Sequence, residues 1–261
     1  MQTDSTFTVL KQTDSRSPRY QAYRAEWDRR GAALDPGVAP IHVDLELVAT
    51  CDLRCQFCNI WTHEHIRTQG FRDNRAYPAG FMDPQLFNNL SVDAAAFGVK
   101  SIKLNYRGEP TLHPEIVRFV SALSNQPFVD IMINSNGNGG ARKDPDIFAK
   151  LVEAGVVNLM FSVDACDPGT YAEQRKGGDW DLLNRSVKSA VEAKMNAKSR
   201  DCRIRASIVR TVLNSDDIDS NRLQDYWLAI GADWVSVSEC YYPGGKRHKW
   251  AVSNWRPMDV D

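Results

Sequence analysis

The residues best suited to chemistry lie in the stretch "CDLRCQFC", which places thiols at Cys51, Cys55 and Cys58. Three thiols at this C-x3-C-x2-C spacing on a short loop favour a metal centre. A structural zinc site is closed by four protein ligands, and His63 and His65 follow Cys58 too closely for the usual ligand spacing. Three thiolates on a cubane iron–sulfur cluster would instead leave one iron open to an exogenous ligand. Zinc, or a redox-active group of thiols, is the alternative.

The composition describes an ordinary globular chain of 261 residues, with 43% hydrophobic and 25% charged residues. This length allows one large α/β domain with a sizeable core. The formal net charge of -1 gives no field that would favour nucleic acid or an anionic membrane. The polar N-terminus resembles no signal peptide, and no run of about 18 apolar residues could span a bilayer. We therefore expect a cytoplasmic protein, where clustered cysteines more often bind metal or catalyse than form disulfides.

From His42 onward, strand-like apolar runs alternate with helix-like runs. The expected strands cover residues 42–49, 100–106, 129–135, 157–163, 203–209 and 233–239. The expected helices cover residues 84–97, 114–124, 145–154, 179–197 and 216–230. Crossovers of this length favour right-handed βαβ units and therefore parallel strands. Six strands fit an α/β fold of the partial (β/α)6 TIM-like barrel type better than a closed barrel of eight.

Three regions follow from this pattern. Residues 1–41 form an N-terminal extension whose charged run "RYQAYRAEWDRRGAAL" predicts a short helix, and residues 42–240 form the partial barrel. Residues 241–261 form a C-terminal tail, which is either the end of a minimal core or the start of a missing or vestigial auxiliary domain.

In barrels of parallel strands, the reactive site lies at the C-terminal ends of the strands. Five unusual features each fall at or just past the end of a different expected strand: Cys51, "GEP" at 108–110, "NSNG" at 134–137, "SVD" at 162–164, and Cys240. We therefore expect all five to meet at one mouth of the barrel.

Side chains alternate between the two faces of each expected strand. The apolar sets are Val43, Leu45 and Leu47; Ile102, Leu104 and Tyr106; and Leu159, Phe161 and Val163. If these sets lie under the helices, polar residues line the interior, among them Lys103, Asn105, Arg205, Ser236 and Ser238. Such a lumen would suit a polar substrate, for example a sugar, a nucleotide or a peptide.

With these motifs in order, "CDLRCQFC" resembles the C-x3-C-x-φ-C signature of the radical S-adenosylmethionine (SAM) enzymes, with Phe57 as the aromatic φ. The resemblance covers about residues 40–240 and implies a six-stranded partial barrel. It implies that Cys51, Cys55 and Cys58 ligate a [4Fe–4S] cluster whose fourth iron binds SAM. It further implies an oxygen-sensitive enzyme that takes electrons from a reductant such as flavodoxin or ferredoxin, cleaves SAM, and abstracts a hydrogen atom from its substrate.

The resemblance also suggests which residues would hold the methionyl part of SAM. Gly108 and Glu109 of "RGEP" resemble the family segment that binds the methionyl amino group. Arg175 of "YAEQRKGG" resembles the arginine that faces the SAM carboxylate, and an exposed helix arginine is the alternative.

Four further positions resemble SAM contacts of the family. Ser135 and Ser162 resemble polar positions that contact the ribose or the methionyl part, and capping of the following helices is the alternative role for both. Val209 falls where family members place a backbone contact to adenine, and Phe57 lies beside the adenine there.

Cys240 allows three interpretations. A lone cysteine at the end of a strand is most often an inert buried side chain. By resemblance, Cys240 could instead ligate an auxiliary cluster, as in members with a SPASM or twitch domain, or donate a hydrogen atom to a substrate radical, as in radical epimerases. Cys166 and Cys202 are expected to be structural.

The order of motifs, from "FMDPQLFNNL" to "YYPGG", is most similar to the SPASM-containing branch, which includes maturases and sugar dehydrogenases or epimerases. A full SPASM domain needs several more cysteines, and residues 241–261 contain none. Redox-neutral reactions therefore gain weight over oxidation. The alternative function, from another class, is a non-catalytic metal-binding or electron-transfer protein with a zinc or iron–sulfur site.

Overall fold

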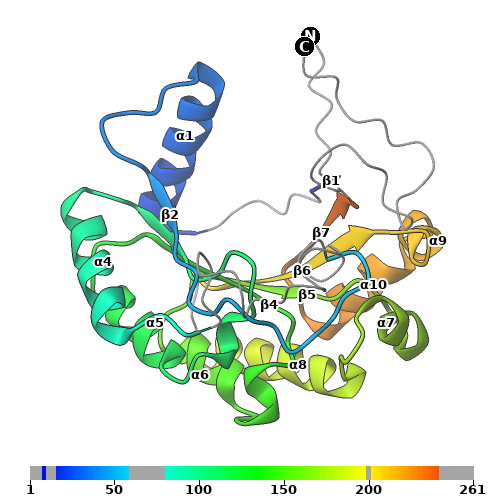
Figure 1. Cartoon of the computed structure of the whole chain (residues 1–261). Coiled ribbons are helices and arrows are strands. Elements are labelled where there is room, and N and C mark those ends of the chain that lie inside the picture. Colours follow the sequence, from blue (N-terminus) through cyan, green and yellow to red (C-terminus); the bar gives the residue numbers. More distant parts are fainter. Residues whose placement is uncertain (1–7, 10–15, 59–79, 198–200, 241–261) are drawn as a thin grey trace, which may run out of the picture.

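One curved sheet organises the chain (Figure 1), which a computed structural model describes for residues 8–9, 16–58, 80–197 and 201–240. Its order is β1-β7-β6-β5-β4-β3-β2. The strands are β1 (Thr8–Val9), β2 (His42–Asp44), β3 (Ser101–Lys103), β4 (Asp130–Ser135), β5 (Asn158–Ser162), β6 (Arg203–Arg210) and β7 (Trp234–Glu239). Strands β2 to β7 are parallel, and each pairs with its neighbour in the sequence. The predicted six-stranded open barrel is therefore confirmed.

Strand β1 is an addition that the sequence did not indicate. Its two residues pair antiparallel with β7, Thr8 with Val237 and Val9 with Ser236. A strand this short has no alternation to reveal it, so only the partner strand defines it.

The principal helices cover the outer face of the sheet (Figure 1). They are α4 (Pro84–Ala96), α5 (Ile116–Ser124), α6 (Ile147–Glu153), α7 (Pro168–Gln174), α8 (Trp180–Asn196), α9 (Ser215–Asp219) and α10 (Arg222–Ile230), with 3-10 turns η1 (Pro110–Leu112) and η2 (Gly140–Arg142). Aspartates cap three of these helices: Asp83 caps α4, Asp167 caps α7, and Asp179 caps α8.

The helix expected at 216–230 is two helices, α9 and α10. The chain breaks between them because Asn221 adopts a left-handed backbone conformation with φ 62°. Asparagine tolerates that conformation better than most residues, so the break carries little strain. The short helix α7 was not predicted.

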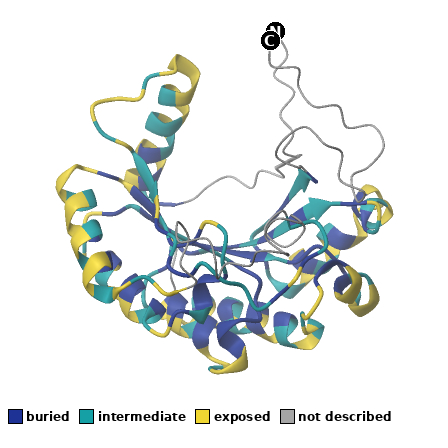
Figure 2. Ribbon diagram, viewed as in Figure 1, coloured by how far each residue is buried: buried dark blue, intermediate teal, exposed yellow. Residues whose placement is uncertain are grey.

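The apolar core lies between the sheet and these helices, and Figure 2 shows the buried residues in dark blue. The expected core residues Leu47, Ile102, Leu104, Leu159 and Phe161 are all buried. The same prediction for Tyr106 was wrong, because its side chain is 66% exposed. Strand β3 ends at Lys103, so the alternation no longer applies three residues later.

Helix α1 (Pro18–Ala33) stands apart from the outer helices (Figure 1). It is the short helix that the sequence predicts in the N-terminal extension. It packs at the N-terminal ends of the central strands through a buried polar network. Arg16, just before the helix, donates to Asn158 Oδ1 at 3.1 Å, and Tyr20 donates to Asp130 Oδ2 at 3.4 Å. Asn158 joins them by donating to Asp130 Oδ1 at 2.6 Å. The opposite end of the strands is left for the site.

In the described part of the chain, no helix is long and apolar enough to cross a membrane. The predicted C-terminal tail, residues 241–261, and the two histidines at 63 and 65 lie outside the described residues.

The packing around Trp227 allows a test of the core. This side chain is fully buried, and its indole N–H donates to the carbonyl of Ala165 at 2.7 Å. Trp227→Ala should lower the free energy of unfolding by about 3–5 kcal/mol, measured by urea titration of the metal-free protein, because it leaves a large cavity. Leu228→Ala, at the neighbouring and partly exposed position, should cost less than about 1 kcal/mol. Equal losses for the two variants would contradict this placement of the core.

Candidate functional site

The loop that carries Cys51, Cys55 and Cys58 follows the strand region around β2 and has no regular structure of its own. Two backbone hydrogen bonds attach it to the last residue of α7 and the segment that follows: Gln56 N to Gln174 O at 3.0 Å, and Arg54 N to Lys176 O at 2.9 Å. The side chain of Leu53 is fully buried and anchors the middle of the loop. The loop is thus held by the same segment that carries Arg175.

Nitrogen donors point at two of the three sulfurs. Cys51 Sγ accepts from the backbone N–H of Leu53 at 3.4 Å and from Asn136 Nδ2 at 3.6 Å. Cys55 Sγ accepts from Arg175 Nη1 at 3.6 Å. Hydrogen bonds of this kind stabilise thiolates and tune the potential of iron–sulfur clusters.

Burial opposes ionisation of the same thiols. It raises the pKa of Cys51 to about 12, with the Glu109 carboxylate adding to the effect, and raises the pKa of Cys55 to about 11. Metal ligation requires thiolates, so a bound cation must compensate for their charge. Three cysteines on one loop that form no disulfide, with N–H donors directed at the sulfurs of Cys51 and Cys55, fit an iron–sulfur cluster.

Gly108 allows the "GEP" segment to lie directly against the chain that enters the cysteine loop. A Cβ at this position would stand 1.9 Å from Val48 O and 2.7 Å from Thr50 O. The next residue completes the contact, because Glu109 N donates to Thr50 O at 2.9 Å. Only glycine fits here, since both obstructing atoms belong to the backbone.

The carboxylate of Glu109 is 3% exposed and accepts hydrogen bonds from two further segments. Its Oε1 accepts from Thr111 N, Thr111 Oγ1 and Ser135 Oγ, at 3.0, 2.6 and 2.8 Å, and its Oε2 accepts from Asn136 N at 2.7 Å. Burial raises the pKa of Glu109, and these hydrogen bonds act in the opposite direction. The structure therefore brings the expected site residues Gly108, Glu109 and Ser135 together.

The glycine-rich run "NSNGNGG" packs around this carboxylate. A Cβ on Gly139 would lie 2.6 Å from Glu109 Cγ, and one on Gly140 would lie 2.5 Å from Thr111 O. The glycines of this run therefore allow the chain to pack closely against Glu109 and Thr111.

Asn136, within the same run, is a site residue that sequence reasoning missed. Its Nδ2 donates to Asp52 Oδ1 at 2.7 Å as well as to Cys51 Sγ. The available signal was its position in the "NSNG" motif, where only Ser135 was singled out.

Arg175 is 6% exposed, so the interpretation as an exposed helix arginine was wrong. Its Nε donates to Asp164 Oδ2 at 2.5 Å, and its guanidinium carbon lies 5.6 Å from the centre of the Phe57 ring. Burial alone would lower the pKa of Arg175, but the Asp164 carboxylate raises it above its usual value, so the guanidinium stays charged. Arg175, Phe57 and Cys55 thus form the second side of the site.

Asp164 connects this side to β6. It adopts a left-handed conformation with φ 54°, and its Oδ1 accepts from Val209 N at 2.6 Å. The carbonyl of Val209 accepts from Asn214 Nδ2 at 3.0 Å. Asp164 was not singled out from sequence, because nothing in the "SVD" motif indicates which partner its carboxylate takes.

Ser162 lies on the inner face of β5, where its hydroxyl donates to Asn134 Oδ1 at 3.0 Å. Helix capping was the wrong alternative for both serines. Asp167 caps the helix after Ser162, and Ser135 Oγ accepts from Gly137 N within a turn, while the next helix has no side-chain cap.

The other cysteines are buried. Cys240 follows β7, and burial raises its pKa to about 11, with the carboxylates of Asp164 and Glu239 adding to the effect. Cys202 and Cys166 are buried as expected for structural residues.

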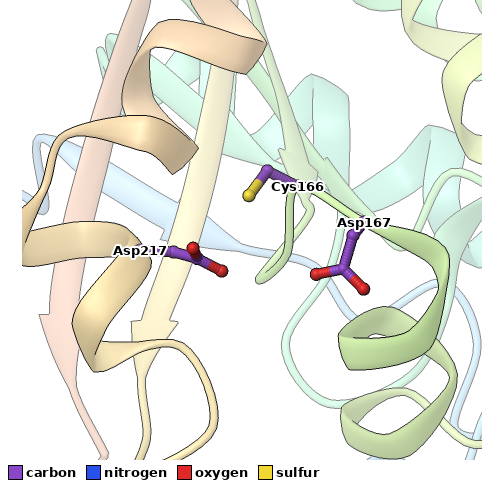
Figure 3. A group of neighbouring side chains, drawn as sticks. All are labelled: Cys166, Asp167 and Asp217. Atoms are coloured by element: carbon purple, nitrogen blue, oxygen red, sulfur yellow. The ribbon is translucent and has the colours of Figure 1, made fainter.

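Cys166 also lies beside Asp167 and Asp217 (Figure 3), with ligand atoms of all three within 4.8 Å of one another. Protein partners account for both carboxylates. Asp167 Oδ1 accepts from Gly169 N and Thr170 N at the start of α7, and Asp217 pairs with Arg222 at 3.1 Å. The group is therefore explained without a metal.

Comparison with known families agrees with this geometry. The family model described as "Radical SAM superfamily" matches residues 45–209. The chain belongs to the radical SAM superfamily. Its members use a [4Fe–4S] cluster and SAM, which fits the three thiols and the donors around them. The expected membership in the SPASM or twitch branch stays a prediction.

Several curated relatives carry the name "Probable GTP 3′,8-cyclase". The relative from Methanococcus maripaludis is 24% identical over 165 residues, which cover 61% of this chain and 50% of the relative. The relative from Methanocaldococcus jannaschii is 24% identical over 151 residues, covering 58% and 45%. The chain spans about half the length of the curated relatives it matches.

Solved structures share the fold. "Native anSMEcpe with bound AdoMet" is 14% identical with a TM-score of 0.59, covering 80% of this chain and 55% of that chain. "Crystal structure of methylornithine synthase (PylB)" is 18% identical with a TM-score of 0.52, covering 92% and 66%.

The contact at Gly108 predicts the first outcome for this site. Gly108→Ala should reduce the iron content of the anaerobically reconstituted protein from about four to less than about one per chain, because the added methyl displaces the entry to the cysteine loop. Iron is measured colorimetrically against protein concentration. Gly31→Ala is the control, since a Cβ there meets nothing within 4 Å. Retention of the full iron content by Gly108→Ala would show that the loop does not depend on this contact.

The buried pair of Arg175 and Asp164 predicts a loss of stability when the carboxylate is removed. Asp164→Asn should lower the free energy of unfolding by about 3 kcal/mol or more, because it leaves a buried guanidinium without its counter-charge. Asp219→Asn breaks the pair with Arg210 at a site where the aspartate is 65% exposed, and should cost less than about 1 kcal/mol. The comparison uses urea titrations of the metal-free proteins. A loss for Asp164→Asn no larger than that of the control would refute the assigned role of this pair.

Proposed function

We propose that this protein is an enzyme that cleaves SAM reductively and uses the resulting radical to abstract a hydrogen atom from a polar substrate. The observation that carries the proposal is the cysteine loop at the C-terminal ends of the parallel strands, with Asn136 and Arg175 donating to two of its sulfurs. A reductant such as flavodoxin or ferredoxin would supply the electrons.

Cys51, Cys55 and Cys58 would hold the cluster. When bound, the [4Fe–4S] cluster supplies the electron that cleaves SAM and so provides the 5′-deoxyadenosyl radical. The residues of the chain hold and orient the reactants and exclude water from them.

One side of the site carries a carboxylic side chain and the other a guanidinium, a combination that suits a zwitterionic methionyl group. The buried carboxylate of Glu109 acts on the Cys51 side, and the guanidinium of Arg175 lies on the Cys55 side. We assign the SAM amino group to the segment Gly108–Glu109 and the SAM carboxylate to Arg175. Ser135 holds Glu109 in place from β4.

The adenosine part of SAM would extend toward the second side. Phe57 packs near Arg175, and Asp164 fixes the end of β6 at Val209, beyond the inner-face hydroxyl of Ser162. These residues would line the part of the site that holds the nucleoside.

The inner face of the sheet supports a polar substrate. Asn105 accepts from Asn134 N at 3.0 Å, and Arg205 donates to Ser236 Oγ at 2.6 Å. The name of the curated relatives favours a nucleotide within that class, and we place a redox-neutral rearrangement ahead of oxidation. The role of Cys240, as a hydrogen-atom donor or an auxiliary ligand, stays a prediction.

The test is anaerobic reconstitution with iron and sulfide, followed by reduction in the presence of SAM. We expect a brown protein with about four irons per chain that releases 5′-deoxyadenosine, detected by chromatography. Cys55→Ser should abolish that release, and Cys202→Ser should retain it, because Cys202 is buried outside the loop.

Two results would contradict the proposal. A colourless protein with one zinc would favour a non-catalytic metal-binding protein. A reducible cluster that leaves SAM intact would favour an electron-transfer protein.

A further inference from the structure

Arg205 is a cation on the inner face of the sheet. Its neighbours on β6, Ile204 and Ala206, point into the apolar core and are buried there, so alternation turns Arg205 to the opposite face. Its Nε donates to Ser236 Oγ on β7 at 2.6 Å, and its Nη1 lies 3.7 Å from Met160 Sδ on β5. The guanidinium is therefore held between two neighbouring strands.

The charge of Arg205 is not balanced by a carboxylate among the described residues. Three other cations of the sheet and its connections have carboxylate partners: Lys103 lies 4.0 Å from Asp44, Arg107 lies 2.7 Å from Glu46, and Arg175 pairs with Asp164. Burial lowers the pKa of Arg205, and no acidic group opposes that effect.

Arg205 is half-buried, and a partly shielded charge whose partners among the described residues are a hydroxyl and a thioether is costly. Arginine is rarely buried unless it is paired, because neutral groups replace only part of the lost hydration. A position that lowers stability and is nevertheless occupied by arginine is expected where the charge binds a ligand.

The pairing register places polar groups around Arg205. Met160 pairs with Arg205 and also with Asn134, so an amide lies in the same cross-strand row. The next inward-facing row toward the C-terminal strand ends contains three serines: Ser162 pairs with Ser207, which pairs with Ser236. Two residues of strand separate the rows by about 6–7 Å. Arg205 thus lies deeper in the sheet interior than the serine row.

We propose that Arg205 binds an anionic group of the substrate, a phosphate or a carboxylate, at the deep end of the polar inner face. The planar guanidinium suits both groups, because its paired N–H donors match two oxygens. An anion held there leaves the rest of the substrate to extend past the serine row toward the cysteine loop. This inference rests on the proposed function and specifies the substrate class of the same site.

The binding test uses the reconstituted full chain loaded with SAM, so that the SAM site does not compete for the probe. Inorganic pyrophosphate and succinate are titrated by calorimetry at fixed ionic strength. We expect saturable binding of at least one probe to the native protein. Tighter binding of pyrophosphate indicates a phosphate on the substrate, and tighter binding of succinate indicates a carboxylate.

Two variants identify the residue responsible. Arg205→Met keeps an unbranched stem beside Met160 and removes the charge, and it should weaken binding at least tenfold. Lys188→Gln removes one charge from an exposed position on α8 and should change binding less than twofold.

A second measurement separates ligand binding from a structural role. Since Arg205→Met removes a shielded charge without a counter-ion, it should raise the Tm of the metal-free protein by about 2–4 °C. A structural arginine would give a lower Tm. Arg205→Lys retains the charge without the planar fork and provides a conservative variant, for which we expect a binding loss of about threefold or more.

Binding to neither probe by the native protein, or binding by Arg205→Met within twofold of native, would overturn the inference. Release of 5′-deoxyadenosine by the native protein is measured in the same preparation. If the native protein cleaves SAM but fails the binding test, only the inference about Arg205 is lost. If it does not cleave SAM, the proposed function itself fails.

Discussion

The close approach of Gly108 to the backbone at Val48 and Thr50 is the constraint on which the rest of the site depends. It allows the β3 connection to turn Glu109 inward, where the carboxylate binds Ser135 and the backbone N–H of Asn136. Asn136 then holds Asp52 and Cys51. The ends of three neighbouring strands are therefore tied together through one buried carboxylate.

The opposite side of the cysteine loop is held by a cation. Arg175 reaches Cys55, and its partner Asp164 fixes Val209 at the end of β6. The loop has no helix or strand of its own, so its conformation comes from these two sides and from the backbone bonds to residues 174 and 176. In the proposed function, the Glu109 carboxylate and the Arg175 guanidinium on opposite sides would orient a zwitterionic cofactor.

Much of the fold could be predicted from the sequence because its strands alternate cleanly and its helices have strong caps. The alternation of Leu159 and Phe161 located β5, and Asp83 with Pro84 is a recognisable start of the helix expected at 84–97. The exposure of Tyr106 could not be predicted, because the end of β3 is set by its partner strands.

The site was predictable only in part, for a related reason. Three thiols at a fixed spacing are visible as a motif, and the glycine and acid of "GEP" stand next to each other in the chain. The roles of Asp164 and Asn136 could not be predicted, because each depends on a partner 11 to 85 residues away. Such partners become visible only after the strands are in register.

The buried network beneath α1 has a consequence for how the chain is made. Arg16 and Asn158 are 142 residues apart, so at about 5–20 residues per second the partner of Arg16 is synthesised roughly 7–28 s later. Until Asp130 and Asn158 are made, the pairs of Arg30 with Glu26 and of Arg24 with Asp28 support the helix locally. Helix α1 therefore cannot complete its buried polar contacts until β5 has been made.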